Sequence, residues 1–104
     1  MEIICVNGSF PPDYIAFYEQ FGVKTPIQDS LYTIRSVRKD YIGGKTGVLL
    51  EELVNPEVPI KHDILSQIKM EPTWDLLRFR HLNGDLINRT EIQEFITKSK
   101  DIAV

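Results

Sequence analysis

One break in an alternating pattern constrains the fold of this chain more than any other feature of its sequence. Within residues 31–39 the apolar side chains fall at Tyr32 and Ile34, and the next one is Val37, one residue out of phase. Because successive side chains of a strand point to opposite faces, such a slip predicts a β-bulge, which bends a strand and increases its twist. The pattern therefore favours a strongly bent antiparallel sheet around a small core.

Other strands are expected on both sides of this segment. Residues 3–6 are a continuous apolar run ended by Asn7-Gly8, which predicts a short strand buried on both faces or placed at the sheet centre. The Gly43-Gly44 turn and the run 47–54 predict a hairpin with residues 31–39, in a register that the sequence leaves open. Residues 73–82 predict one strand that ends at the Asn83-Gly84 turn, with residues 86–87 as a possible fifth.

Helices are expected in two places. Ser9 and the prolines that follow it suit a helix start, and Gly22 suits a left-handed stop. Between them an i, i+3, i+4, i+7 aromatic series predicts an amphipathic helix over residues 12–21, lying on the sheet. A capping box at Thr90–Gln93, or Asn88 as the cap, predicts a C-terminal helix over about 89–98. The aromatic series is Tyr14, Phe17, Tyr18 and Phe21.

The tract 55–72 has no clear period and carries three prolines, Pro56, Pro59 and Pro72. It is too long for a tight turn. Its apolar residues predict a loose helical turn that covers one end of the sheet: Ile60, Ile64, Leu65 and Ile68.

Composition bounds the class of protein. A chain of 104 residues with 42% apolar and 26% charged residues predicts one globular domain over 1–104. Its net charge of −3 gives no overall attraction to nucleic acid or to an anionic membrane. The single cysteine, Cys5, excludes an internal disulfide. The N-terminal apolar run is too short for a signal peptide, and no run is long enough to span a membrane, so we expect a cytoplasmic protein.

Residues with catalytic or metal-binding chemistry are scattered. Cys5 lies in an apolar run without a neighbouring base, which is typical of an inert buried thiol. His62 and His81 lack the paired spacing of a zinc site. The letters Gly-Lys-Thr at 44–46 precede an apolar strand where a phosphate-binding loop requires a helix. We therefore predict no enzyme activity, no metal and no cofactor.

Glu51 and Glu52 point to opposite faces of a strand, so they cannot flank one substrate bond. One of them should face inward or lie at the bulge. The simpler interpretation is a cross-strand pair with Arg35 or Arg38. A hydrolase that combined one of these carboxylates with His62 or His81 would need a deep polar pocket.

A Trp–Arg surface is the remaining candidate site. On residues 73–82 the alternation places Trp74, Leu76, Arg78 and Arg80 on one face and Asp75, Leu77 and Phe79 on the other. Arg35 should lie on a neighbouring strand, close to Arg38 and Lys39. Tryptophan and arginine are enriched in protein hot spots and also form platforms for single-stranded nucleic acid. In the plainer alternative, Trp74 covers the core and the arginine stems lie over it, paired with Asp75 or Glu51.

The order of the strand motifs resembles a known group of proteins. The motifs are Ile4-Cys5-Val6-Asn7, Leu31-Tyr32-Thr33-Ile34-Arg35, Gly47 to Pro56 (GVLLEELVNP) and Trp74 to Leu82 (WDLLRFRHL). Together they are similar to small uncharacterised SH3-like barrel proteins of bacterial genomes, phages and mobile elements. The resemblance covers about residues 3–82. It implies about five short strands closed into a small barrel with a core over 3–87, and it carries no catalytic residues.

The same resemblance makes the helix after the first strand and the tract 56–72 insertions on the barrel. Two functions follow as expectations. The first is a non-catalytic binding module that holds a protein partner, or a second copy of itself, through Trp74, Arg78, Arg80 and Arg35. The alternative is a nucleic-acid-binding accessory protein of a phage or mobile element.

Overall fold

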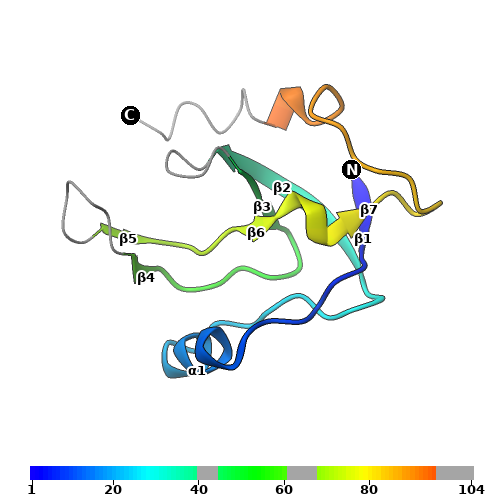
Figure 1. The fold of residues 1–104 in the computed structure, drawn as a ribbon. Coiled ribbons are helices and arrows are strands. Elements are labelled where there is room, and N and C mark those ends of the chain that lie inside the picture. Colours follow the sequence, from blue (N-terminus) through cyan, green and yellow to red (C-terminus); the bar gives the residue numbers. More distant parts are fainter. Residues whose placement is uncertain (40–44, 61–67, 96–104) are drawn as a thin grey trace.

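A five-stranded antiparallel sheet forms the centre of the computed structural model, which describes residues 1–39, 45–60 and 68–95 (Figure 1). The strand order is β6-β3-β2-β1-β7. The predicted strand at residues 3–6 is confirmed, one residue earlier, and it lies between two neighbours in the sheet. The predicted hairpin is also confirmed, while its Gly43-Gly44 turn lies outside the described residues. The strands are β1 Glu2–Cys5, β2 Leu31–Lys39, β3 Thr46–Leu50, β6 Trp74–Asp75 and β7 Phe79–Arg80.

The predicted bulge is present in β2. Ile34 lies opposite Leu50 and Ser36 lies opposite Leu49, so the pairing skips Arg35. The skip lets Tyr32, Ile34 and Val37 all face the core, where they are 5%, 2% and 1% exposed. The out-of-phase apolar series is therefore the sequence signature of this bend.

The expected continuous strand over residues 73–82 is interrupted, and its assigned faces are wrong. A 3₁₀ turn, η1 (Leu76–Arg78), separates β6, which pairs with β3, from β7, which pairs with β1. The Asp75 carboxylate caps this turn by accepting a hydrogen bond from the Leu77 backbone N–H at 3.0 Å. Because the turn rotates the chain, Leu77 is 69% exposed while Phe79 is 1% exposed.

The sheet is not closed into a barrel, which corrects the expected closed SH3-like barrel. β6 and β7 occupy opposite edges of the sheet, although only η1 separates them along the chain. No strand ladder joins the two edges among the described residues. The Arg78 carbonyl, next to β7, accepts hydrogen bonds from Val6 and Asn7, which follow β1. The fold is a mostly-β α+β domain with a curled, open sheet.

The tract 55–72 contains a second, two-stranded sheet where a loose helical turn was expected. β4 (Val58–Ile60) pairs with β5 (Ile68–Met70), with Val58 opposite Met70. Ile60 and Ile68 thus belong to strands, and Ile64 and Leu65 lie outside the described residues. Pairing with a second strand offers the extended backbone around Pro59 hydrogen bonds that a helical turn at a proline could not supply.

The short strand expected at residues 86–87 does not form, and a turn precedes these residues. The Gly84 N–H donates to the His81 carbonyl, and Gly84 has a φ of +93°, a conformation that favours glycine. Ile87 nevertheless joins the core at 8% exposed, while Leu86 is 65% exposed.

The helix after β1 is confirmed as α1 (Pro12–Gln20), and Gly22 follows it with a φ of +72°. Ser9 does not cap it: Pro11 holds the N-cap position, and the Ser9 N–H donates to the Asn7 side chain. Nor does α1 lie flat on the sheet, because none of its residues is fully buried. It is attached mainly through Tyr18, which packs against the core.

The C-terminal helix is described only over residues 93–95, and its expected end near 98 lies outside the described residues. Asn88, the alternative cap, forms reciprocal bonds with Glu91 in the turn that precedes this helix. Its N–H donates to Glu91 Oε2 at 2.9 Å, and the Glu91 N–H donates to Asn88 Oδ1 at 3.1 Å. Ile92, which is 0% exposed, belongs to the core. The short helix after it lies on the far side of the sheet from α1 (Figure 1). No helix in the described part of the chain has the length and apolar character needed to cross a membrane.

Candidate functional site

An aromatic cluster joins β6 to α1 and to the segment just before α1. The Trp74 ring packs edge-on against Phe10 and Tyr18, with ring centroids 5.7 and 5.5 Å apart, and Phe10 and Tyr18 pack against each other at 6.0 Å. Trp74 is only 2% exposed. This agrees with the plainer expectation that Trp74 covers the core, and it leaves other side chains to form the accessible surface.

Arg78 locks the loop before α1 onto this cluster. Its guanidinium carbon lies 3.8 Å from the centroid of the Phe10 ring, a cation–π contact. Its Nη1 donates hydrogen bonds to the backbone carbonyls of Asn7 (3.1 Å) and Ser9 (2.7 Å). The expected pairing of Arg78 with Asp75 is wrong, because the Asp75 carboxylate caps η1 instead.

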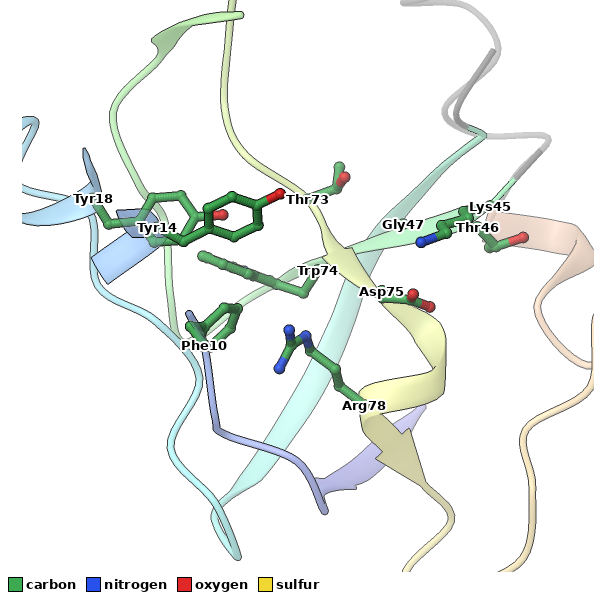
Figure 2. A pocket seen from close by; sticks show the side chains of 10 residues that line it. All are labelled: Phe10, Tyr14, Tyr18, Lys45, Thr46, Gly47, Thr73, Trp74, Asp75 and Arg78. Atoms are coloured by element: carbon green, nitrogen blue, oxygen red, sulfur yellow. The ribbon is translucent and has the colours of Figure 1, made fainter. Parts of the chain in front are cut away.

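A hollow of about 330 Å³ opens beside the cluster, between α1 and the β6–β3 edge. Figure 2 shows Tyr14 and Tyr18 on one side of Trp74, with Phe10 and Arg78 on the other. Tyr14 is the accessible aromatic of this wall, at 57% exposed. We call it the aromatic hollow; its lining residues are Phe10, Tyr14, Tyr18, Lys45, Thr46, Gly47, Thr73, Trp74, Asp75 and Arg78.

Backbone packing forms the floor of this hollow. A Cβ on Gly47 would lie 2.4 Å from the hydroxyl oxygen and 2.6 Å from the Cβ of Thr73, so only glycine lets β3 approach this segment so closely. Burial raises the pKa of Tyr18, although the nearby Arg78 charge opposes the shift. Tyr18 is therefore a neutral hydroxyl at physiological pH.

Of the four predicted site residues, only Trp74 and Arg78 line the hollow. Arg35 lies elsewhere: its Nη2 is 2.6 Å from Glu71 Oε2, and its Nε donates to the Leu50 carbonyl at 3.2 Å. Arg80 donates to the carbonyls of Leu77 and Phe79, both at 2.9 Å. The structure thus divides the predicted Trp–Arg surface into separate parts.

Arg35 belongs to a polar network centred on Glu71. The Glu71 carboxylate also accepts the Asn55 N–H at 3.0 Å, and its carbonyl accepts Nη1 of Arg38 at 3.0 Å. The Asn55 side chain, in a residue 8% exposed, bonds both the N–H and the carbonyl of Lys24. Burial lowers the pKa of Arg38, and the Glu71 charge opposes that shift. We call Glu71 and the three residues bonded to it, Arg35, Arg38 and Asn55, the Glu71 network.

Glu51 and Glu52 are both exposed, so neither faces inward, and both follow the end of β3 at Leu50, next to the bulged pairing of β2. Neither carboxylate forms an ion pair with Arg35 or Arg38 among the described residues. Glu52 instead accepts hydrogen bonds from the N–H and hydroxyl of Thr33, at 2.7 and 2.8 Å. Burial would raise the pKa of Glu52, but these two bonds outweigh it and lower the pKa. Through these two hydrogen bonds the Glu52 carboxylate attaches the segment after β3 to β2.

The histidines and the thiol also lie apart from the hollow. His81 Nε2 bonds the Glu91 carboxylate at 2.9 Å, and His62 lies outside the described residues. Cys5 is 0% exposed, and burial raises the pKa of its thiol. In the described ranges no three His, Cys, Asp or Glu side chains cluster as a metal site would require.

A second hollow, of about 430 Å³, adjoins the aromatic hollow and shares Phe10 and Tyr18 with it. We call it the apolar hollow. Apart from the shared aromatic pair, its apolar lining comes from α1, from the segment after α1, and from the segment after β3. These residues are Ile15, Val23, Ile27 and Leu53, and Gly8, Glu19, Lys24 and Thr25 also line the hollow.

Sequence reasoning missed Phe10, Tyr14 and Tyr18 as site residues. The signal for Tyr14 and Tyr18 was the aromatic series of the expected helix, which was interpreted as packing α1 flat on the sheet. Phe10 precedes α1 and lies outside that series. Comparison with protein-family models, with curated proteins and with solved structures finds no match to this chain.

Proposed function

We propose that this protein is a non-catalytic binding module that holds a segment of a protein partner in the aromatic hollow. The observation that carries the proposal is the combination of a buried support and an exposed contact. Trp74, at 2% exposed, fixes the wall of the hollow, while Tyr14, at 57% exposed, presents a large amphipathic ring at its rim. Rigid aromatic side chains of this kind give much contact area at a low entropic cost.

The hollow has polar groups that could orient a partner. Thr46 and Thr73 contribute hydroxyls, and Lys45 contributes an exposed ammonium group. Arg78 already bonds two backbone carbonyls, so it serves the partner by keeping Phe10 in place. A small number of polar groups among aromatic walls is the usual composition of a recognition site.

The nucleic-acid alternative has less support. Arg35, Arg78 and Arg80 each use one or two of their nitrogens to bond carboxylate or carbonyl oxygens of this chain, which fixes their side chains against the protein. Trp74 has almost no exposed ring face for base stacking. We keep the SH3-like class as a proposal for the fold, supported by one continuous segment that supplies both edges of the curled sheet.

Site-specific photo-crosslinking in the native host tests the binding proposal. A photo-reactive phenylalanine analogue in place of Tyr14 should yield a reproducible adduct with one protein. The same analogue in place of Leu82, which is 53% exposed and does not line the hollow, is the matched control. We expect the Tyr14 adduct to be lost when Thr73→Arg fills the hollow. An adduct at both positions, or at neither, would refute the proposal.

A further inference from the structure

The apolar hollow has a different character from the aromatic one. Ile15 and Ile27 contribute to its walls although they are 42% and 66% exposed. Val23 and Leu53 are more buried and lie deeper in the chain's own packing. Exposed branched aliphatic side chains around a hollow mark a surface whose burial against a partner is favourable.

Two opposite charges are among the residues that line this hollow. Glu19 lies in the last turn of α1, and Lys24 lies just beyond Gly22. They are the charged residues among its lining, and both are exposed. Neither side chain has an ion-pair or hydrogen-bond partner within the described ranges. The charged lining of the hollow is therefore neutral overall, in a chain whose net charge is −3.

A surface that carries one charge of each sign can be complementary in charge to a second copy of itself. In a two-fold symmetric contact, the same patch is used by both subunits, so residue i of each copy meets residue j of the other. If Glu19 meets Lys24 of the partner subunit, the symmetry repeats the pair, and both charges of both copies are matched.

From this self-complementarity we infer that a second copy of the chain covers the apolar hollow, as a two-fold homodimer. Ile15 and Ile27 pack across the contact, and two reciprocal Glu19–Lys24 pairs flank it. The aromatic hollow stays separate, although Phe10 and Tyr18 support both surfaces. The dimer thus presents two partner-binding hollows, which would give a bivalent partner an avidity that one copy lacks.

Charge reversal tests the contact by sedimentation equilibrium. Because like charges then face each other twice, Glu19→Lys alone and Lys24→Glu alone should each weaken dimerisation by at least about tenfold. The double variant, Glu19→Lys with Lys24→Glu, should restore it. Mixing the two single variants should give a heterodimer, since each then carries the charges that the other lacks.

An apolar substitution tests the same face independently. Ile27→Asp should abolish the dimer, whereas Leu86→Asp should leave it intact, because the two residues are almost equally exposed at 66% and 65% and only Ile27 lines the hollow. Circular dichroism shows that each variant is folded. A wild-type chain that stays monomeric, including one whose hollow is covered by a different protein, would overturn the inference. So would a dimer that ignores both charge reversals or that Leu86→Asp disrupts.

Discussion

The Glu71 network and the aromatic hollow are each organised by an arginine, and sequence reasoning placed both arginines on one surface. In the Glu71 network, Arg35 meets a carboxylate that is itself 14% exposed, and its Nε bonds the Leu50 carbonyl. Beside the aromatic hollow, Arg78 lies on the Phe10 ring and bonds two backbone carbonyls. The comparison teaches that an arginine's role is set by what the fold places against it. Arg35 holds the structure together, while Arg78 supports a surface that remains open.

The largest effect should come from removing the support of the aromatic hollow. Trp74→Ala deletes a fully buried aromatic side chain and leaves a cavity that Phe10 and Tyr18 cannot fill, at a cost of about 3–5 kcal/mol in the free energy of unfolding. Tyr14→Ala, at a 57% exposed position of the same hollow, should cost less than about 1 kcal/mol. Urea unfolding followed by circular dichroism measures both. Equal losses would show that Tyr14, too, is structural.

An intermediate effect is expected in the Glu71 network. Glu71→Ala leaves the Arg35 guanidinium and the Asn55 N–H without their acceptor, which should cost about 2 kcal/mol. Arg35→Met combined with Glu71→Leu should recover more than half of the loss at that site, because no charge is left unpaired. The double variant should bind a partner at the aromatic hollow with unchanged affinity. A binding defect would mean that Arg35 acts at the interface after all.

The smallest effect is a response to acid. Glu52 has a lowered pKa in the folded state, so its bonds to Thr33 add stability above its usual value of 4.5 and lose it as the pH falls through the folded value. The hydrogen-exchange protection factor of the Thr33 N–H, which is the intrinsic rate divided by the observed rate, should therefore fall below pH 4.5, before the fluorescence of Trp74 changes. Glu52→Gln should flatten this pH dependence of Thr33 exchange. A Trp74 signal that changes first would contradict the order.

The elements that depend on local patterns could be predicted from the sequence. The phase slip across Tyr32, Ile34 and Val37 predicted the bulge in β2, because a strand must rotate each of these side chains toward the same core. Pro12 and Gly22 predicted the bounds of α1 through the backbone conformations that they favour. Asn88, kept as an alternative cap, does exchange N–H bonds with Glu91, but these bonds close the turn that precedes the helix at 93–95.

The elements that depend on distant partners could not be predicted. Alternation along residues 73–82 gave no sign that Asp75 would cap a 3₁₀ turn, because the turn is favoured only when β6 and β7 have different strands to pair with. Pro59 gave no sign of a strand until residues 68–70 supplied its partner. Two of the four predicted site residues, Arg35 and Arg80, lie away from the hollow for the same reason.

The sequence by itself determined a bent, mostly-β domain with an aromatic helix after its first strand. Those features follow from the spacing of apolar side chains and from the backbone limits of proline and glycine, which act over a few residues. Only the tertiary structure decided that the sheet stays open, that Glu71 captures Arg35, and that Phe10, Tyr18 and Trp74 meet at one hollow. Each of these depends on contacts between segments far apart in the chain, whose free energy exists only once the whole sheet has formed.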